Sequence, residues 1–277
     1  MSPLEFVLTL FAICLVAGFV GSLMGLGGGV IVVPALTLVY GIDIRYAIGA
    51  SIVSVIATSS GAAAAYVRQH MTNLRTAMLL EVGTTTGAIT GAFLAGVVHG
   101  RWLFLMFGLL LGYSALAMLR RKPGRDRPVP PDSWADRLRL HGSYFDEAKG
   151  VEVSYRVGHA RLGLALMYLA GTVSGLLGIG SGVLKVPAMD LAMRIPLKVS
   201  TATSNLMIGV TAAASAGVYF ARGDVDPFIA APVATGVVLG ATAGSRVLAK
   251  ADSRLLRALF VLILLAVAAQ MLLRGLR

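Results

Sequence analysis

Two glycine-rich stretches and one lysine are the residues of this chain best suited to hold a charged ligand. The stretches are Gly25-Leu26-Gly27-Gly28-Gly29 and Gly178-Ile179-Gly180-Ser181-Gly182, and a proline follows each one five residues later. Glycine lets a ligand approach the backbone, and a helix that begins there offers free N–H groups and a positive dipole end. Lys185 adds a positive charge where the first stretch has Val32. The pattern predicts a site for a small anion.

The two stretches are copies of one unit. They lie 153 residues apart, and the same offset relates other residues along the chain. Examples are the pairs Gly18 and Gly171, Ser51 and Ser204, Thr58 and Thr211, Tyr66 and Tyr219, and Gly87 and Gly240. The chain is therefore predicted to use one structural unit twice.

Composition places these units in a membrane. Of the 277 residues, 57% are hydrophobic and 13% are charged, against about 25% charged in soluble domains. Ten of the 24 Lys and Arg residues fall between Arg120 and Arg161, which is typical of charge that orients membrane helices. We therefore expect contact with lipid and no nucleic-acid partner, despite the net charge of +11. Cys14 is the single cysteine, which excludes a disulfide framework.

Apolar runs locate the expected helices. Residues 4–24 read as a retained helix rather than a signal peptide, because no basic region precedes them. Residues 30–40 are long enough for about half a bilayer, at about 1.5 Å per residue, and so predict a half-helix. Residues 46–67, 77–98 and 102–119 predict further spans, and 143–157 a short β hairpin. The glycine stripes at 83, 87 and 91 and at 236, 240 and 244 predict close helix packing.

These elements predict an all-α polytopic membrane protein with two inverted repeats. Each repeat consists of a broken, re-entrant helix hairpin and three transmembrane helices, so that about eight full or near-full spans result. We expect residues 1–121 to form repeat 1, 122–158 a cytoplasmic linker, and 159–277 repeat 2. With this arrangement the basic loops face the cytoplasm and both termini lie outside. Paired, interrupted helices in an inverted repeat indicate a transporter's midplane binding site.

Several side chains are candidates for that site, each with an alternative role. Polar residues on one helix face either line a cavity or bond to a neighbouring helix. The predicted substrate-binding set is Gly27, Gly28, Gly29, Ser51, Gly180, Ser181, Gly182, Lys185, Thr201, Ser204 and Asn205. The glycines alternatively serve only for tight helix crossing, and Lys185 alternatively pairs with Asp190 or reaches the membrane surface.

Glu81 and Asp190 are weaker candidates for a coupling role, with protons as the coupling ion. Glu81 has no counterpart in the second half, where Ala234 occupies the equivalent position. It lies about a turn from the expected cytoplasmic end of its helix, where pairing with Arg75 is an alternative. The four histidines fall in loops without ligand spacing, so we expect no metal site and no cofactor.

The second-half sequences GIGSGVLKVPAMDL and PLKVSTATSN, with the paired glycine loops followed by proline, resemble the sulfite exporter TauE/SafE family of anion permeases. Ser181 departs from that pattern, which usually has glycine there. The resemblance implies a carrier in the bacterial inner membrane for sulfite, sulfonates or related anions. The residues alone predict only a small anion.

Together these features predict a secondary transporter that exports small sulfur-containing anions by alternating access. A passive anion channel would share every feature. A membrane sensor or enzyme that uses the central loop is the other alternative, although that loop holds no paired catalytic groups, so we expect no enzymatic activity.

Overall fold

Long helices make up most of the protein. The computed structural model describes residues 2–120, 129, 131–147, 150–178, 180–248 and 253–276. The first half contains α1 (Pro3–Met24), α2 (Gly29–Pro34), the π-helical turn η1 (Ala35–Val39), α3 (Ile44–Arg68), α4 (Leu74–Ala95) and α5 (Gly100–Arg120). The second half contains α7 (Ala160–Leu177), α8 (Gly182–Pro187), η2 (Ala188–Ala192), α9 (Leu197–Ala221), α10 (Pro227–Leu248) and α11 (Ser253–Leu276). The predicted all-α polytopic class is confirmed.

Six helices of the described part are long and apolar enough to cross a membrane: α1, α3, α4, α7, α9 and α10. The apolar stretches of α5 and α11 are shorter, at residues 100–116 and 261–276. Of the eight full or near-full spans expected from the sequence, these six have the length and composition of a span, and for α5 and α11 the expectation stays a prediction.

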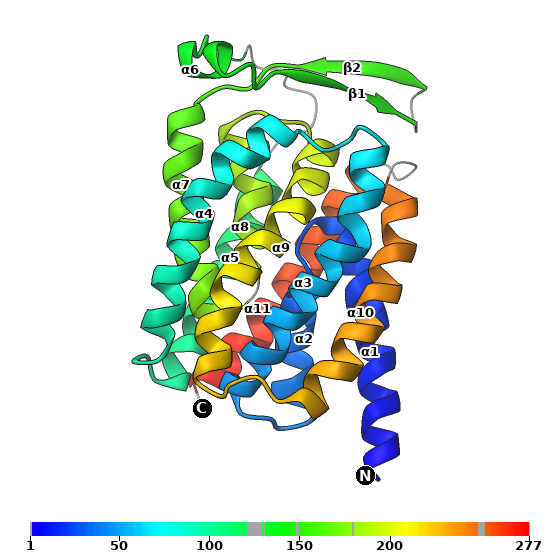
Figure 1. Ribbon diagram of the computed structural model, residues 1–277, viewed down its shortest axis with the longest axis vertical. Helices are drawn as coiled ribbons and strands as arrows, with labels where there is room; N and C mark the ends of the chain where they lie inside the picture. The colour runs from blue at the N-terminus through cyan, green and yellow to red at the C-terminus, as the bar shows by residue number, and fades with distance from the viewer. Residues whose placement is uncertain are drawn as a thin grey trace.

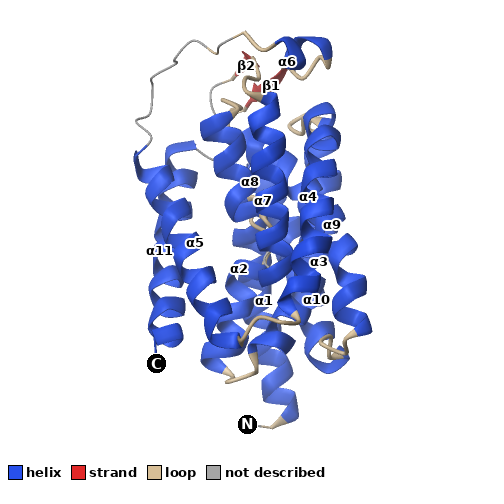
Figure 2. Ribbon diagram, turned by 90° about the vertical axis from the view of Figure 1, so that its left-hand side faces the viewer, coloured by secondary structure: helices blue, strands red, loops and turns tan. Residues whose placement is uncertain are grey.

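The two halves are interleaved rather than placed side by side. α1 packs along α10, α4 along α7, and α5 along α11, so every one of these pairs joins the two halves. In Figure 2, α5 and α11 lie together at one edge of the bundle. A Cβ atom on Gly87 would overlap the carbonyl of Tyr168, and one on Gly240 would overlap the carbonyl of Leu15. The predicted packing role of the glycine stripes is thus confirmed.

The equivalent helices of the two halves run in opposite directions. α1 begins at the lower end of the bundle in Figure 1, whereas α7 begins at the upper end, below the two strands. Both chain termini lie at the end opposite to these strands. This is the geometry that an inverted repeat requires; the orientation in a membrane stays a prediction.

The central polar segment is folded. It contains α6 (Ser133–Arg137) and the antiparallel strands β1 (Gly142–Asp146) and β2 (Val151–Tyr155), in register with Tyr144 opposite Val153. The predicted hairpin is confirmed, although its expected turn residues Ala148 and Lys149 lie outside the described residues. We call the described residues 131–158 the cap, because they cover the upper ends of several helices (Figure 1).

Two carboxylates organise the cap. Asp132 accepts hydrogen bonds from the backbone N–H groups of Trp134 and Ala135 and from that of Ala160, the first residue of α7. Partial burial opposes ionisation, but these N–H groups outweigh it and hold the pKa of Asp132 below its usual range. The Asp146 carboxylate lies 2.8 Å from the ammonium of Lys198 on α9, with side chains 2% and 1% exposed. The cap is therefore joined to the helix bundle by buried polar contacts.

Candidate functional site

The two glycine-rich interruptions meet inside the protein. α1 ends before Gly25 and α7 before Gly178, and both glycines have left-handed backbone geometry. A Cβ atom on Gly182 would overlap the carbonyl oxygen of Gly25, so only glycine allows the two loops to touch here. The structure thus brings together the two stretches that the repeat predicted as partners.

Two serines hold this crossing in matching ways. The hydroxyl of Ser51 on α3 donates to the carbonyl of Gly178, at 2.7 Å, and that of Ser204 on α9 donates to the carbonyl of Gly25, also at 2.7 Å. Each serine thereby caps the broken helix of the other half, since a helix end leaves its carbonyls without partners. Both hydroxyls belong to the predicted substrate-binding set, and in the structure they donate hydrogen bonds to backbone carbonyls.

Asn205 and Thr201 lie beside the same crossing. The Asn205 amide donates to the carbonyls of Ser22, at 2.7 Å, and of Thr201, at 3.2 Å. Its Oδ1 atom is buried and has no hydrogen-bond partner among the described residues. The predicted residues on α9 therefore pack against the end of α1.

The half-helices are shorter than a simple dipole site would need. α2 and α8 each have six α-helical residues and then widen into π-helical turns after Pro34 and Pro187. Because proline lacks an N–H, it cannot continue the ordinary bonding pattern. The dipole of so short a helix is small, since it grows with the number of aligned peptide units. An anion therefore needs a further source of positive charge.

Lys185 provides that charge. Its side chain is fully buried, with 0% exposed, on α8 one turn beyond the glycine loop. The ammonium donates to the hydroxyl of Thr211 on α9, at 2.6 Å, and lies 3.6 Å from the Glu81 carboxylate on α4. Among the described residues, Thr211 is the one hydrogen-bond acceptor of this ammonium, which has three N–H donors. A buried cation with unused donors is suited to receive an anion.

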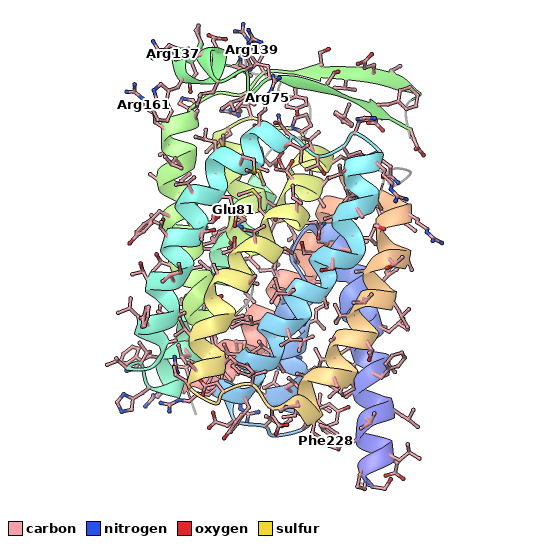
Figure 3. The ribbon with its side chains drawn as sticks, viewed as in Figure 1. Arg75, Glu81, Arg137, Arg139, Arg161 and Phe228 are labelled. Carbon is pink, nitrogen blue, oxygen red and sulfur yellow. The ribbon has the colours of Figure 1, made fainter. Side chains whose placement is uncertain are left out.

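Glu81 completes the cluster. Its Oε1 atom accepts hydrogen bonds from Thr211, at 2.6 Å, and from Thr85, at 3.1 Å. Its Oε2 atom is buried, has no hydrogen-bond partner among the described residues, and is the atom that faces Lys185. Thr84 lies 3.4 Å from the Thr211 hydroxyl. Figure 3 shows Glu81 between α4 and α9, in the half of the bundle nearer to the cap.

This arrangement corrects two alternatives drawn from the sequence. The guanidinium of Arg75 donates to the carbonyl of Arg139 in the cap, so pairing of Glu81 with Arg75 is wrong. The ion-pair partner that the structure gives to Lys185 is Glu81, on another helix, rather than Asp190. Asp190 itself is buried on η2.

Sequence reasoning missed the hydroxyls of Thr84, Thr85 and Thr211 as members of this cluster. The run Thr84-Thr85-Thr86, one turn after a carboxylate in an apolar helix, was a usable signal. Thr211 was visible only as the repeat partner of Thr58. Thr58 instead accepts a hydrogen bond from the backbone N–H of Gly28, at 3.0 Å, so the two halves use the same threonine differently.

The site is hence asymmetric. The positions equivalent to Lys185 and Glu81 are Val32 and Ala234, neither of which carries charge. The described residues contain no group of three His, Cys, Asp or Glu side chains that would hold a metal ion. The chemistry of the cluster is binding of charge, with one cation, one carboxylate and three hydroxyls.

The helical fold and this buried polar cluster are compatible with a membrane transporter, and sequence comparison supports that class. The family model described as sulfite exporter TauE/SafE matches residues 10–271, and the chain therefore belongs to this family. It is 26% identical over 268 residues to the probable membrane transporter protein YunE of Bacillus subtilis, covering 94% of this chain and 95% of that one. It is 31% identical over 255 residues to a probable membrane transporter protein of Xylella fastidiosa, covering 91% and 89%. No solved structure matches the chain.

Proposed function

We propose that this protein is a secondary transporter, acting as an exporter, of small sulfur-containing anions such as sulfite and organosulfonates. The observation that carries the proposal is the fully buried ammonium of Lys185, which has one hydrogen-bond acceptor among the described residues. A lysine within the membrane costs about 2.5–3.5 kcal/mol on insertion scales, so it generally serves a pathway or binds a partner. The family supplies the sulfur-anion class.

In this proposal the anion binds the ammonium of Lys185, which the hydroxyl of Thr211 orients, close to the loop that ends at Gly182. Gly180 and Ser181 belong to the same loop, and Gly27, Gly28 and Gly29 to the loop that crosses it. The serines at 51 and 204, with Asn205, hold the two broken helices together around the site, and the backbone of Thr201 lies beside Gly25. Alternating access then arises when one set of helices moves against the other about this crossing.

We infer further that residues 1–121 and 159–277 are inverted repeats and that 122–158 is cytoplasmic, with both termini outside. The opposite directions of α1 and α7 in Figure 1 support the inversion. Exposed arginines near the cap support its placement in the cytoplasm, because cytoplasmic loops of membrane proteins carry an excess of basic residues. Figure 3 labels Arg75, Arg137, Arg139 and Arg161 at this end of the protein.

Binding of sulfite and methanesulfonate to the purified protein tests the site. We expect Lys185→Met to weaken both by roughly 10- to 100-fold, the range for a lost hydrogen bond to a charged group of about 1.5–3 kcal/mol. Unchanged affinity in a folded variant would contradict the site. In vesicles, sulfite flux should saturate and show counterflow; flux that never saturates would instead indicate a channel.

Thr211→Val and Thr58→Val form a matched pair for the same measurement. Both remove one buried threonine hydroxyl at equivalent positions of the two halves. We expect Thr211→Val to weaken anion binding roughly tenfold, because the hydroxyl bonds to the charged groups of the cluster. Thr58→Val removes the bonds of this hydroxyl to the Gly28 N–H and to the Ser54 carbonyl, both outside the charged cluster, and should lower stability without changing affinity. Equal effects on affinity would argue against an asymmetric site.

A further inference from the structure

The carboxylate of Glu81 occupies the place beside Lys185 that an anion would need. Its Oε2 atom, which lies 3.6 Å from the ammonium, is the oxygen without a hydrogen-bond partner. Its Oε1 atom is held by the hydroxyls of Thr211 and Thr85. Glu81 is thus fixed by one oxygen while the other faces the cation.

Charge balance limits what can happen when an anion arrives. Lys185 compensates one negative charge, and its side chain has no exposure to water. A second anion beside an ionised Glu81 would be a buried and uncompensated charge, which is strongly unfavourable. Two anionic groups that share one site do not both stay ionised at neutral pH. Anion binding therefore requires that Glu81 lose its charge.

We propose that Glu81 is the resident counter-anion of Lys185, and that a transported anion replaces it only as the Glu81 carboxyl takes up a proton. The proton adds to Oε2, which is free to accept it and then donates to the bound anion. Of the two side chains, that of Glu81 is 13% exposed and that of Lys185 is not exposed at all, so the carboxyl is the group nearer to the protein surface. This inference rests on the proposed anion transport and identifies its coupling ion.

The basic groups near these helices have partners other than Glu81. On α4, Arg75 bonds to the Arg139 carbonyl. On α7, the guanidinium of Arg161 stacks over the Trp134 ring, 5.1 Å from its centre. On α9, Lys198 pairs with Asp146 in the cap, and on η2, Asp190 is buried. Within the described part, Lys185 is the one ion-pair partner that the structure gives to Glu81.

The exchange has a defined consequence for transport. Without substrate the site holds a carboxylate and an ammonium, and with substrate it holds a neutral carboxyl, an ammonium and a monovalent anion. Both states have the same net charge, so one proton crosses with each monovalent anion and no net charge moves. An inward proton gradient then favours uptake, and net export requires a larger outward gradient of the anion.

Methanesulfonate is a suitable probe because its charge does not change between about pH 5 and pH 8. Binding to the wild-type protein should strengthen up to tenfold for each unit by which pH falls, since one proton is taken up per anion bound. Glu81→Gln should bind methanesulfonate with no pH dependence. Glu147→Gln, which changes an exposed carboxylate in the cap, should behave as wild type.

Vesicles that contain a pH-sensitive dye measure the transport step. We expect wild-type uptake of methanesulfonate to carry protons inward and to change less than twofold when a potassium diffusion potential is imposed. Glu81→Gln should carry the anion without protons and respond to that potential. Proton movement that persists in Glu81→Gln would overturn the proposal.

Two outcomes separate this inference from the proposed function. Wild-type transport of methanesulfonate without proton movement, or wild-type binding that does not depend on pH, would refute the role of Glu81 and leave anion transport standing. Absence of any sulfite or methanesulfonate binding by the wild type would refute the proposed function itself. The wild-type pH series decides the matter even if Glu81→Gln fails to fold.

Discussion

Individual residues of the two halves divide into those that keep the repeat and those that break it. Ser51 and Ser204 each donate an equivalent hydrogen bond to a glycine carbonyl of the opposite half. The hydroxyls of Tyr66 and Tyr219 likewise donate to the equivalent carbonyls of Ser22 and Gly175. Lys185 has no such counterpart. Structural contacts are therefore duplicated, whereas the ionisable cluster, formed by Glu81 of the first half and Lys185 of the second, has no equivalent elsewhere in the repeat.

The serine pair leads to a prediction about stability. Ser51→Ala and Ser204→Ala each leave a buried carbonyl without its hydroxyl donor, and both should lower the free energy of unfolding by about 1–3 kcal/mol. Thermal unfolding in detergent measures this, with sulfite affinity as the second readout. Similar losses of stability with little change in affinity would match the structure. A large affinity loss in either variant would instead place that hydroxyl on the anion.

At the scale of elements, the cap and the charged cluster share the same supporting helices. Buried side chains of the cap, such as Leu140 and Tyr144, pack in one hydrophobic cluster with Leu80 of α4 and Met207 of α9. Leu80 precedes Glu81, and Met207 lies one helical turn before Thr211. If α4 or α9 moves during transport, the cap must therefore either move with that helix or lose these contacts.

The Lys198–Asp146 pair allows this docking to be tested. Lys198→Met removes the ammonium that lies beside the buried Asp146 carboxylate, which should weaken docking by about 3–5 kcal/mol. Hydrogen exchange across β1 and β2 should then increase, and the double variant Lys198→Met with Asp146→Leu should restore protection. Arg156→Met, which breaks an exposed pair with Asp136, is the control and should have little effect. Unchanged exchange in Lys198→Met would show that other contacts hold the cap.

At the scale of the whole molecule, the halves depend on each other. α1 packs mainly against α10 of the other half, and α4 packs mainly against α7. Glycines permit both contacts at distances that no larger residue allows. Because these surfaces are buried against the opposite half, neither half is expected to be stable alone.

Orientation is a property of the whole molecule that labelling can measure. We expect a membrane-impermeant thiol reagent to modify Ser2→Cys in intact cells, and Ser143→Cys only in inverted membrane vesicles. Both positions are exposed, and the native Cys14 is buried, so background labelling should be low. Labelling of both positions from the same side would contradict a cap and an N-terminus on opposite faces.

Much of the architecture could be predicted from the sequence, because it depends on local composition and on the duplication of the chain. The runs 4–24 and 46–67 became α1 and α3 with ends within two residues of those expected. The predicted interruptions at Gly25 and Gly178 were also correct, since glycine and proline act on the backbone where they stand. The folded cap was anticipated only as a linker with a hairpin, because its stability comes from contacts with distant helices.

The candidate site was predicted in part. Lys185 was identified because a charge in an apolar segment is conspicuous in any sequence, and Ser51 and Ser204 because they repeat. The carboxylate that pairs with Lys185 was not predicted, because the sequence offered Asp190 on the same segment and paired Glu81 with Arg75. The actual pairing depends on how α4, α8 and α9 pack.

The sequence by itself determined that this chain is a membrane protein built from two copies of a broken-helix unit, because hydropathy, glycine and proline act locally. Only the tertiary structure decided that Lys185 faces Glu81 and that each serine caps the helix of the other half. These contacts join elements far apart in the chain, and their geometry exists only once the two halves have packed together.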